Sequence, residues 1–312
     1  MILVNDKSNS IDGKYSTTRL VTKQTPRIMD YPEDKFKSAL FLPVKAGRKG
    51  EGGIRTQGYF KKSFDKKPLI SIVTIVYNGE KYLEKTIQSV INQNYDNIEY
   101  IVIDGDSTDG TVDIIKKYED KIDYWISEKD KGISAAFNKG VTCSTGERLL
   151  MLNTGDFFID NSFLKSNISQ LLTVEDVVFF SVRVDNNRNL PSEDVLSSLE
   201  KILDKVQVPH QSAFVKLSSY KRCGLYNTNF KIRMDYEFFL RLISCNSKFK
   251  YLNVVAVQYL VGGISMQFKN RALFEIEALI SNYIYGKTVR KSMKNSFKKI
   301  FYNIYLVVKG FI

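Results

Sequence analysis

Residues 69–93 read LISIVTIVYNGEKYLEKTIQSVINQ, and this stretch decides the fold. Its first eight positions carry no charge and are rich in β-branched residues, which is typical of a parallel strand covered on both faces. The residues that follow place Leu83, Ile87, Val90 and Ile91 at helical spacing. The stretch therefore predicts one β-strand followed by one α-helix.

The same alternation continues toward residue 153. Uncharged or β-branched runs predict strands at 98–104, 122–128 and 147–153, and helical spacing predicts helices at 112–121 and 132–144. Strands that alternate with helices imply right-handed crossovers and a mostly parallel sheet. We therefore expect an α/β fold, with a Rossmann-like, mostly parallel sheet flanked by helices.

Composition sets outer limits on the function. The chain has 312 residues, of which 43% are hydrophobic and 26% charged, so it can bury a large core. The formal net charge of +12 favours an anionic partner, such as a nucleotide, a nucleic acid or an acidic lipid surface. Cys143, Cys223 and Cys245 lack CxxC spacing, and the start of the chain lacks a signal-peptide core. We expect reduced thiols in a cytoplasmic protein, and no apolar run reaches the length of a membrane span.

Polar residues follow the predicted strands where a ligand would bind, because ligands of such sheets lie beyond the carboxyl ends of the strands. The clusters are Tyr77-Asn78, Asp104-Gly105-Asp106 and Thr154-Gly155-Asp156. Neither a dinucleotide-binding GxGxxG after the first strand nor a P-loop is present. We expect Asp156 at the mouth of a pocket, where its oxygens suit Mg²⁺ or Mn²⁺. The alternative is that Asp156 caps the next helix.

These motifs together resemble a known enzyme family. The run from SIVTIVYNGEKYLEK to IVIDGDSTDGTVDIIKKY, followed by SEKDKGISAAFNKG and LNTGD, is similar to the family 2 glycosyltransferases of the GT-A fold, in particular bacterial enzymes that build surface polysaccharides. The resemblance is close over 69–158, and PHQSAFVK and MDYEFFLRL extend it to about 243. It implies a nucleotide-sugar donor, favouring a UDP-sugar, and an inverting transfer in one displacement.

The resemblance also assigns the donor site. It implies that nucleotide-sugar contacts come from Thr74, Tyr77, Asn78, Asp104, Asp106, Asp130, Lys131 and Asn138. The alternative for Tyr77 is a half-exposed aromatic residue of the core. The alternative for Lys131 is a place in a solvated turn. The sequence departs from the family pattern at three positions: Gly105 replaces a second aspartate, Phe137 replaces an arginine of some relatives, and Thr154 replaces the first acid of the metal motif. Asp156 alone is then left to hold Mn²⁺ or Mg²⁺.

An inverting transfer needs a base that takes the proton of the acceptor hydroxyl. The resemblance implies that this base is Asp235, at the start of a helix anchored by Met234, Phe238 and Leu242. The alternative is an acid that only stabilises the helix dipole. Glu237 is a weaker candidate, assigned to acceptor binding. His210 is expected to contact the acceptor or a metal, with a purely structural role as the alternative.

These assignments divide the chain into three parts. Residues 1–68 form an N-terminal extension or linker, 69–265 a GT-A domain with a nucleotide-sugar half (69–158) and an acceptor half (159–265), and 266–312 a basic amphipathic helical tail. The tail suits the inner face of an anionic membrane, although a helix packed on the domain is the alternative. The family implies a glycan or a polyprenyl-diphosphate-linked sugar as acceptor.

Two other classes of function stay open. A sugar-nucleotide nucleotidyltransferase would also use a nucleotide and a metal-binding acid, but YNGEKY is a poor phosphate loop. A nucleic-acid-binding protein would explain the net charge, yet basic and aromatic residues are not interleaved on one recognisable platform. We therefore expect no nucleic-acid partner.

Overall fold

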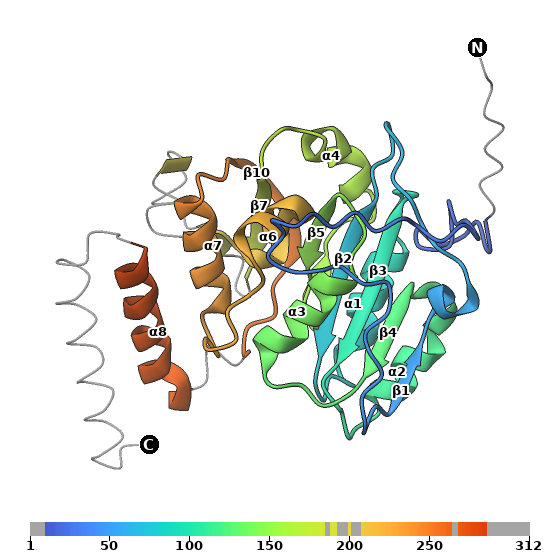
Figure 1. The fold of residues 1–312 in the computed structure, drawn as a ribbon, viewed down its shortest axis with the longest axis horizontal. Coiled ribbons are helices and arrows are strands. Elements are labelled where there is room, and N and C mark those ends of the chain that lie inside the picture. The colour runs from blue at the N-terminus through green and yellow to red at the C-terminus, as the bar shows by residue number, and fades with distance from the viewer. Residues whose placement is uncertain (1–9, 185–187, 192–198, 201–206, 264–267, 286–312) are drawn as a thin grey trace.

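The computed structural model describes residues 10–184, 188–191, 199–200, 207–263 and 268–285, and Figure 1 shows their arrangement. These residues build one ten-stranded sheet in the order β1-β4-β3-β2-β5-β9-β7-β10-β6, with β8 beside β7. The strands are β1 (Gly50–Gly52), β2 (Ile70–Val76), β3 (Ile98–Asp104), β4 (Tyr124–Ser127), β5 (Arg148–Met151), β6 (Phe157–Phe158), β7 (Val177–Arg183), β8 (Asn189–Leu190), β9 (Ala213–Lys216) and β10 (Phe249–Gln258).

The parallel part of the sheet lies where the sequence predicts it. Strands β4, β3, β2 and β5 are mutually parallel neighbours. Beyond β5 the sheet becomes mixed, because β9 pairs antiparallel with both β5 and β7, while β10 runs parallel to β7. The strand-helix alternation ends after β5, so the local pattern carries no signal for this second half.

Helices cover both faces of the sheet. They are α1 (Leu83–Ile91), α2 (Thr111–Lys117), α3 (Ile133–Cys143), α4 (Phe163–Leu171), α6 (Leu217–Cys223), α7 (Met234–Ser244) and α8 (Arg271–Ile284), with short 3-10 turns η1 (Ile54–Gln57), η2 (Glu119–Lys121), η3 (His210–Ser212) and η5 (Phe268–Asn270). The helix predicted at 79–93 is shorter, since Gly79 accepts the N–H groups of Tyr82 and Leu83 in a turn before it.

The hydrophobic core has two layers because successive strand residues point to opposite faces. On β3, Ile101 and Ile103 join the layer under α3 and α7, whereas Tyr100 and Val102 join the layer under α1 and α4. Helix α3 approaches β2 closely at Gly140, where an added Cβ would lie 2.3 Å from Val73 Cγ1. The fully buried strands thus fix the positions of the loops at their carboxyl ends.

The N-terminal extension is part of the folded domain and not a linker. Strand β1 pairs antiparallel with β4 and forms an edge of the sheet. The Arg55 guanidinium is buried, donates to the carbonyls of Leu40 and Cys143, and contacts Glu99 Oε1 at 2.5 Å. In Figure 1 the blue segment before β1 crosses the face of the sheet, with Ala39 N–H bonded to Thr142 O. The extension is therefore held by buried polar contacts.

Helix α8 also belongs to this folded unit, beside α7 in Figure 1. The buried Glu277 carboxylate accepts the backbone N–H groups of Lys231, Ile232 and Arg233 at 2.7, 3.0 and 2.8 Å. The predicted tail from 266 thus includes a packed helix at 271–284, while 286–312, which carry most of its basic residues, lie outside the described part of the chain. Within that part, no helix combines the length and apolarity that crossing a bilayer requires.

Candidate active site

The loops after β2 and β3 are tied together at one edge of the sheet. Asn78 N–H donates to Ser107 Oγ at 2.8 Å, and Asn78 Oδ1 accepts the N–H of Thr108 at 2.9 Å. Asn78 has a φ of 50°, a left-handed conformation that asparagine tolerates well. Beside this junction, the Tyr77 side chain is 66% exposed, so the structure presents it as a surface aromatic and not as a core residue.

Two of the predicted donor residues, Thr74 and Asp104, form hydrogen bonds within the protein. The buried Thr74 hydroxyl donates to Leu152 O at 2.8 Å and accepts the Tyr100 hydroxyl at 3.0 Å. The buried Asp104 carboxylate accepts Ser107 N–H at 3.0 Å and Ser127 Oγ–H at 2.6 Å. Their polar atoms are already used, so the structure gives both residues an organising role behind the loops.

A cluster of charges lies next to Tyr77. A Cβ on Gly105 would lie 3.4 Å from Asp130 Oδ2 and 3.6 Å from Tyr77 Cδ2, which places these three residues together. Lys139 Nζ contacts Asp130 Oδ1 at 2.5 Å, and the Asp130 side chain is only 9% exposed. Burial raises the pKa of Asp130 despite this lysine. Within the described residues, Asp130 Oδ2 is buried and has no hydrogen-bond partner.

The remaining predicted donor residues differ in their surroundings. Asp106 pairs with Lys49 of the N-terminal extension at 2.6 Å, and Lys49 also donates to Ser107 O at 3.2 Å. Lys131 is exposed in the turn before α3. Asn138 does not point to the donor loops: its amide donates to Tyr226 O and accepts Tyr226 N–H, both at 2.8 Å. The donor-binding prediction for Asn138 is therefore not supported.

Asp156 is buried, contrary to the expectation of a residue at a pocket mouth. Its side chain lies in the turn after β5, 2% exposed, and Oδ1 accepts Leu260 N–H at 3.0 Å. A Cβ on Gly155 would lie 2.7 Å from Leu260 Cδ2, so Leu260 covers this turn. Asp156 caps no helix either, because α4 begins at Phe163 after Ser162.

This burial changes the charge chemistry of Asp156. Burial raises its pKa to about 7, against the opposing effects of the Leu260 hydrogen bond and the His210 charge. In the described part of the chain, no three His, Cys, Asp or Glu side chains gather as metal ligands. A lone carboxylate still fits Mg²⁺ or Mn²⁺, which commonly take one protein carboxylate together with substrate phosphates. Among the described residues, the Leu260 N–H occupies Oδ1 only, and no hydrogen bond occupies Oδ2.

Asp235 lies in the first turn of α7 and forms a connected pair with His210. His210 Nδ1 is 2.9 Å from Asp235 Oδ2, and Tyr236 N–H donates to Asp235 Oδ1 at 2.7 Å. Burial raises the pKa of Asp235, but the hydrogen bonds from His210 and the Tyr236 N–H, together with the Arg233 charge, outweigh it and hold this pKa below its ordinary value. The carboxylate is thus ionised at neutral pH while its side chain stays 29% exposed.

A third residue completes the chain of contacts. Asn153, directly after β5, places Nδ2 at 3.1 Å from His210 Nε2. The edge of Phe137, at a centroid distance of 6.0 Å, packs against the His210 ring. Phe137 is fully buried, so the position where some relatives carry arginine here supports His210. His210 thus lies between Asn153 and Asp235, and its predicted contact with the acceptor or a metal stays a prediction.

Glu237 lies two residues beyond Asp235 but is not available to an acceptor. Its buried carboxylate receives both Arg241 Nε and Nη2 at 3.0 Å, and Tyr285 donates to Oε1 at 2.5 Å. These contacts connect α7 with the end of α8. The structure therefore corrects the acceptor-binding prediction and gives Glu237 a structural role.

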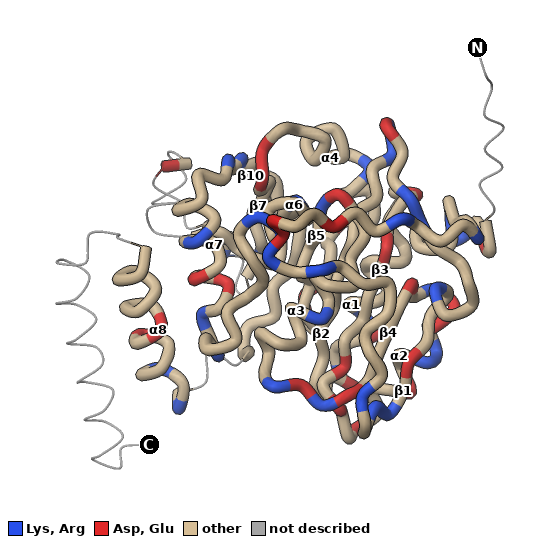
Figure 2. The backbone as a smooth tube through the Cα atoms, in the orientation of Figure 1, with Lys and Arg blue, Asp and Glu red and all other residues tan. Residues whose placement is uncertain are grey.

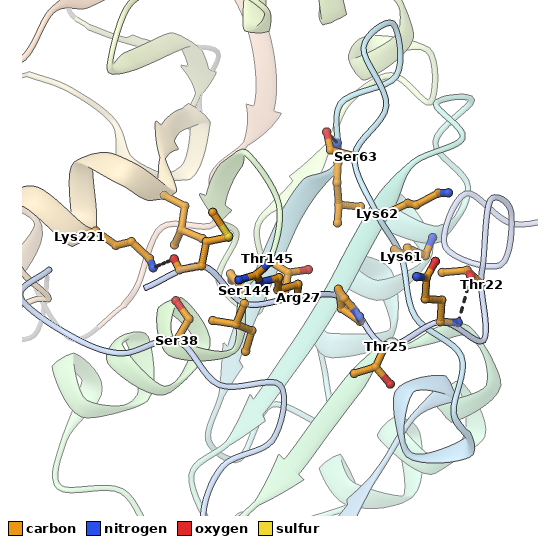
Figure 3. A pocket seen from close by; sticks show the side chains of 16 residues that line it. Thr22, Thr25, Arg27, Ser38, Lys61, Lys62, Ser63, Ser144, Thr145 and Lys221 are labelled. Atoms are coloured by element: carbon orange, nitrogen blue, oxygen red, sulfur yellow. Dashed lines mark hydrogen bonds between the residues drawn. The ribbon is translucent and has the colours of Figure 1, made fainter. Parts of the chain in front are cut away.

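A cavity of about 460 Å³ lies at the opposite edge of the sheet (Figure 3). It is lined by the extension and by residues at the amino ends of β2 and β5, including Leu69 and Thr145. Its cations are already engaged: Lys221 donates to Met29 O and contacts Asp30, and Lys61 donates to the carbonyls of Ser16 and Arg19. The cavity contains none of the predicted site residues.

Sequence reasoning missed several residues that organise the site. Asn153 adjoins the LNTGD motif but is an ordinary polar residue at a strand end. Thr86 of α1 accepts Gly155 N–H at 3.0 Å and donates to Asp156 O at 2.9 Å. Lys49 and Leu260 reach the site from segments that carry no motif. Of these residues, only Thr86 could have been found from the sequence, because it is a polar residue on the apolar face of a predicted helix.

The mixed sheet, with carboxylates beyond its parallel strands and on the facing helix, agrees with the GT-A glycosyltransferase fold expected from the sequence. Comparison with known proteins supports this class. The model of the family described as "Glycosyl transferase family 2" matches residues 71–228. The chain belongs to that family and is a glycosyltransferase, which confirms the resemblance seen in the sequence.

Individual relatives agree. An uncharacterized glycosyltransferase of Mycobacterium tuberculosis is 34% identical over 183 residues, covering 56% of this chain and 68% of that protein. The structure of S. aureus TarS in complex with UDP-GlcNAc has a TM-score of 0.55 at 19% identity, covering 68% of this chain and 66% of that one. The Pyrobaculum calidifontis mannosyltransferase PcManGT, in complex with GDP-Man and Mn²⁺, has a TM-score of 0.57 at 16% identity, covering 78% and 70%. These two structures confirm the predicted fold.

Proposed function

We propose that the protein transfers a sugar from a nucleotide-sugar donor to a hydroxyl acceptor with inversion, with Asp235 as the general base. The observation that carries the proposal is the Asp235 carboxylate, ionised yet partly exposed in the first turn of α7 and held by His210. A base needs a free oxygen within reach of the acceptor hydroxyl and must be unprotonated before reaction. Asp235 is ionised and partly exposed, and each of its oxygens accepts one hydrogen bond and keeps a further lone pair for the acceptor hydroxyl.

The reaction follows from this role. Asp235 takes the acceptor proton while the acceptor oxygen bonds to the anomeric carbon and the bond from that carbon to the diphosphate oxygen breaks. The products are an inverted glycoside, a nucleoside diphosphate and a protonated Asp235, which returns its proton to water. Asp156 would hold Mn²⁺ or Mg²⁺, whose positive charge stabilises the departing diphosphate. The Mn²⁺ complex of the archaeal mannosyltransferase supports a divalent ion.

The donor pocket is proposed at the loops after β2, β3 and β4. The exposed ring of Tyr77 suits stacking on a nucleobase, and the neighbouring Asp130 Oδ2 can accept a hydrogen bond from the base or ribose. Lys131 can meet the diphosphate as a point charge. The UDP-GlcNAc complex of TarS supports a UDP-sugar as donor. The family resemblance favours a glycan or polyprenyl-diphosphate-linked acceptor in surface polysaccharide synthesis at the inner face of the membrane.

The alternative classes find less support. Residues 77–82, after β2, do not form the glycine-rich phosphate loop of a nucleotidyltransferase. Figure 2 shows Lys and Arg interspersed with Asp and Glu along the described backbone, which gives a nucleic-acid-binding role no specific support from these residues.

The test is a panel of nucleotide sugars with detection of the free nucleoside diphosphate, followed by Asp235→Asn. This variant keeps the size of the side chain but removes the proton acceptor. We expect kcat to fall by about 10² to 10⁴, with donor affinity within a few-fold of wild type. Asp113→Asn is the matched control, because Asp113 is an exposed acid in the first turn of α2. If both variants keep wild-type turnover, Asp235 only stabilises its helix and the proposal is wrong.

A further inference from the structure

The contact between Asp235 and His210 determines where the histidine carries a proton. A carboxylate only accepts hydrogen bonds, so at 2.9 Å from Asp235 Oδ2 the ring nitrogen Nδ1 must be protonated. The other tautomer would set two lone pairs against each other. His210 therefore donates Nδ1–H to Asp235, and the state of Nε2 remains to be fixed by its other neighbour.

That neighbour is Asn153. With Nδ2 at 3.1 Å from Nε2, the amide donates, so Nε2 holds a lone pair and the ring is neutral. In this orientation Asn153 Oδ1 is buried and has no hydrogen-bond partner among the described residues. Such an oxygen costs free energy unless it is used in another state of the site. Turning the amide over would offer this oxygen to Nε2–H of a charged ring.

Asn153 can thus serve both charge states of His210 without disturbing the Nδ1–H bond to Asp235. The ring itself has little freedom, because it is 14% exposed, lies in the η3 turn after Pro209 and packs against the edge of Phe137. The turn is anchored in the sheet by Ser212, whose hydroxyl donates to Phe180 O at 2.5 Å. Residues from three separate segments therefore converge on one imidazole.

We infer that Asn153 and His210 are positioning residues for the base: Asp235 fixes the Nδ1–H tautomer of His210, Asn153 donates to Nε2 of the neutral ring, and His210 holds the Asp235 carboxylate so that its free oxygen lone pairs face the acceptor hydroxyl. This inference rests on the proposed function for its catalytic consequence, but the hydrogen-bond arrangement itself can be tested without any activity.

The first test uses the fact that His210 is the only histidine of the chain. In protein purified without a histidine tag and isotope-labelled on the imidazole nitrogens, NMR reports one ring. At about pH 8 we expect the Nδ1–H tautomer with a lone pair on Nε2, which is the arrangement that the Asp235 and Asn153 contacts require. In Asn153→Asp, a carboxylate facing Nε2 should protonate both nitrogens at this pH. A wild-type ring protonated on Nε2 alone, or a spectrum unchanged by Asn153→Asp, would overturn the inference.

The second test measures the consequence for catalysis. His210→Ala should lower kcat by about 10- to 100-fold with donor KM unchanged, the range typical when a residue that orients a reacting side chain is removed. His210→Asn should recover most of this loss, since its amide N–H replaces Nδ1–H. Equal losses in both variants would refute positioning through this bond. If the NMR result holds and no transferase activity is found, the hydrogen-bond chain stands and only the proposed function fails.

Discussion

Replacing Asp156 by asparagine should stabilise the metal-free protein, although Asp156 is the proposed metal ligand. Burial raises its pKa from 3.8 to about 7, so the folded protein binds this proton more tightly than the unfolded chain does. Folding free energy is therefore lost as pH rises from about 4 to about 7, and the full difference corresponds to about 4 kcal/mol. Asparagine carries no charge and can still accept Leu260 N–H through Oδ1.

The assay is urea unfolding of both proteins with a chelator present. Between about pH 5 and about pH 8.5, we expect the stability advantage of Asp156→Asn to grow by about 2 to 3 kcal/mol. Asp235→Asn is the internal control, and this substitution should lower the stability at neutral pH. The reason is that the pKa of Asp235 is lowered, so its ionised form stabilises the folded state. With Mn²⁺ and a nucleoside diphosphate, wild type and Asp235→Asn should gain the metal-dependent stabilisation, and Asp156→Asn should not. Parallel pH profiles for wild type and Asp156→Asn would refute this reasoning.

Three further variants test other parts of the structure. Arg55→Ala should cost about 3 to 5 kcal/mol of unfolding free energy, because it leaves the buried Glu99 without its cation, whereas Arg19→Ala, in a partly exposed pair with Asp96, should cost about 1 or less. Tyr77→Ala should weaken UDP binding in calorimetry by about 5- to 150-fold if the ring stacks on the base, while Tyr82→Ala should leave it unchanged. Asp130→Asn should weaken UDP binding by about 10- to 100-fold, and adding Gly105→Asp should restore part of it, because a side chain at 105 reaches the same space. Wild-type affinity in Asp130→Asn would exclude this residue from the pocket.

The sequence predicts the first half of the fold well because its signals are local. The apolar runs of β2 and β3 and the helical spacing of α1 each depend on a few neighbouring residues. The antiparallel position of β9 between β5 and β7 depends instead on pairing across more than 30 residues, which no local pattern reports. The place of Asp235 at the start of a helix was predictable for the same local reason, since the apolar face of α7 indicates where that helix lies.

The orientation of individual side chains was harder to predict. Strand β2 is covered on both faces, so its composition does not indicate that the Thr74 hydroxyl forms hydrogen bonds with Leu152 O and the Tyr100 hydroxyl. Asp156 is covered by a backbone N–H from a residue 104 positions later in the chain. Glu237 reads as an acid beside the base, yet its partners Arg241 and Tyr285 make it structural. Contacts between distant segments decide which of the predicted carboxylates remain available.

The Glu277 contact has a consequence for how this enzyme could be divided or recombined. A fragment that stops at 265 would contain every residue assigned to chemistry, yet three N–H groups just ahead of Asp235 would lose their acceptor. Chimeras that exchange the acceptor half between relatives must therefore carry α8 along with α7. Helix α8, which holds the segment just before Asp235, lies beyond the last catalytic motif. A domain boundary drawn from the motifs alone would therefore divide one folded unit.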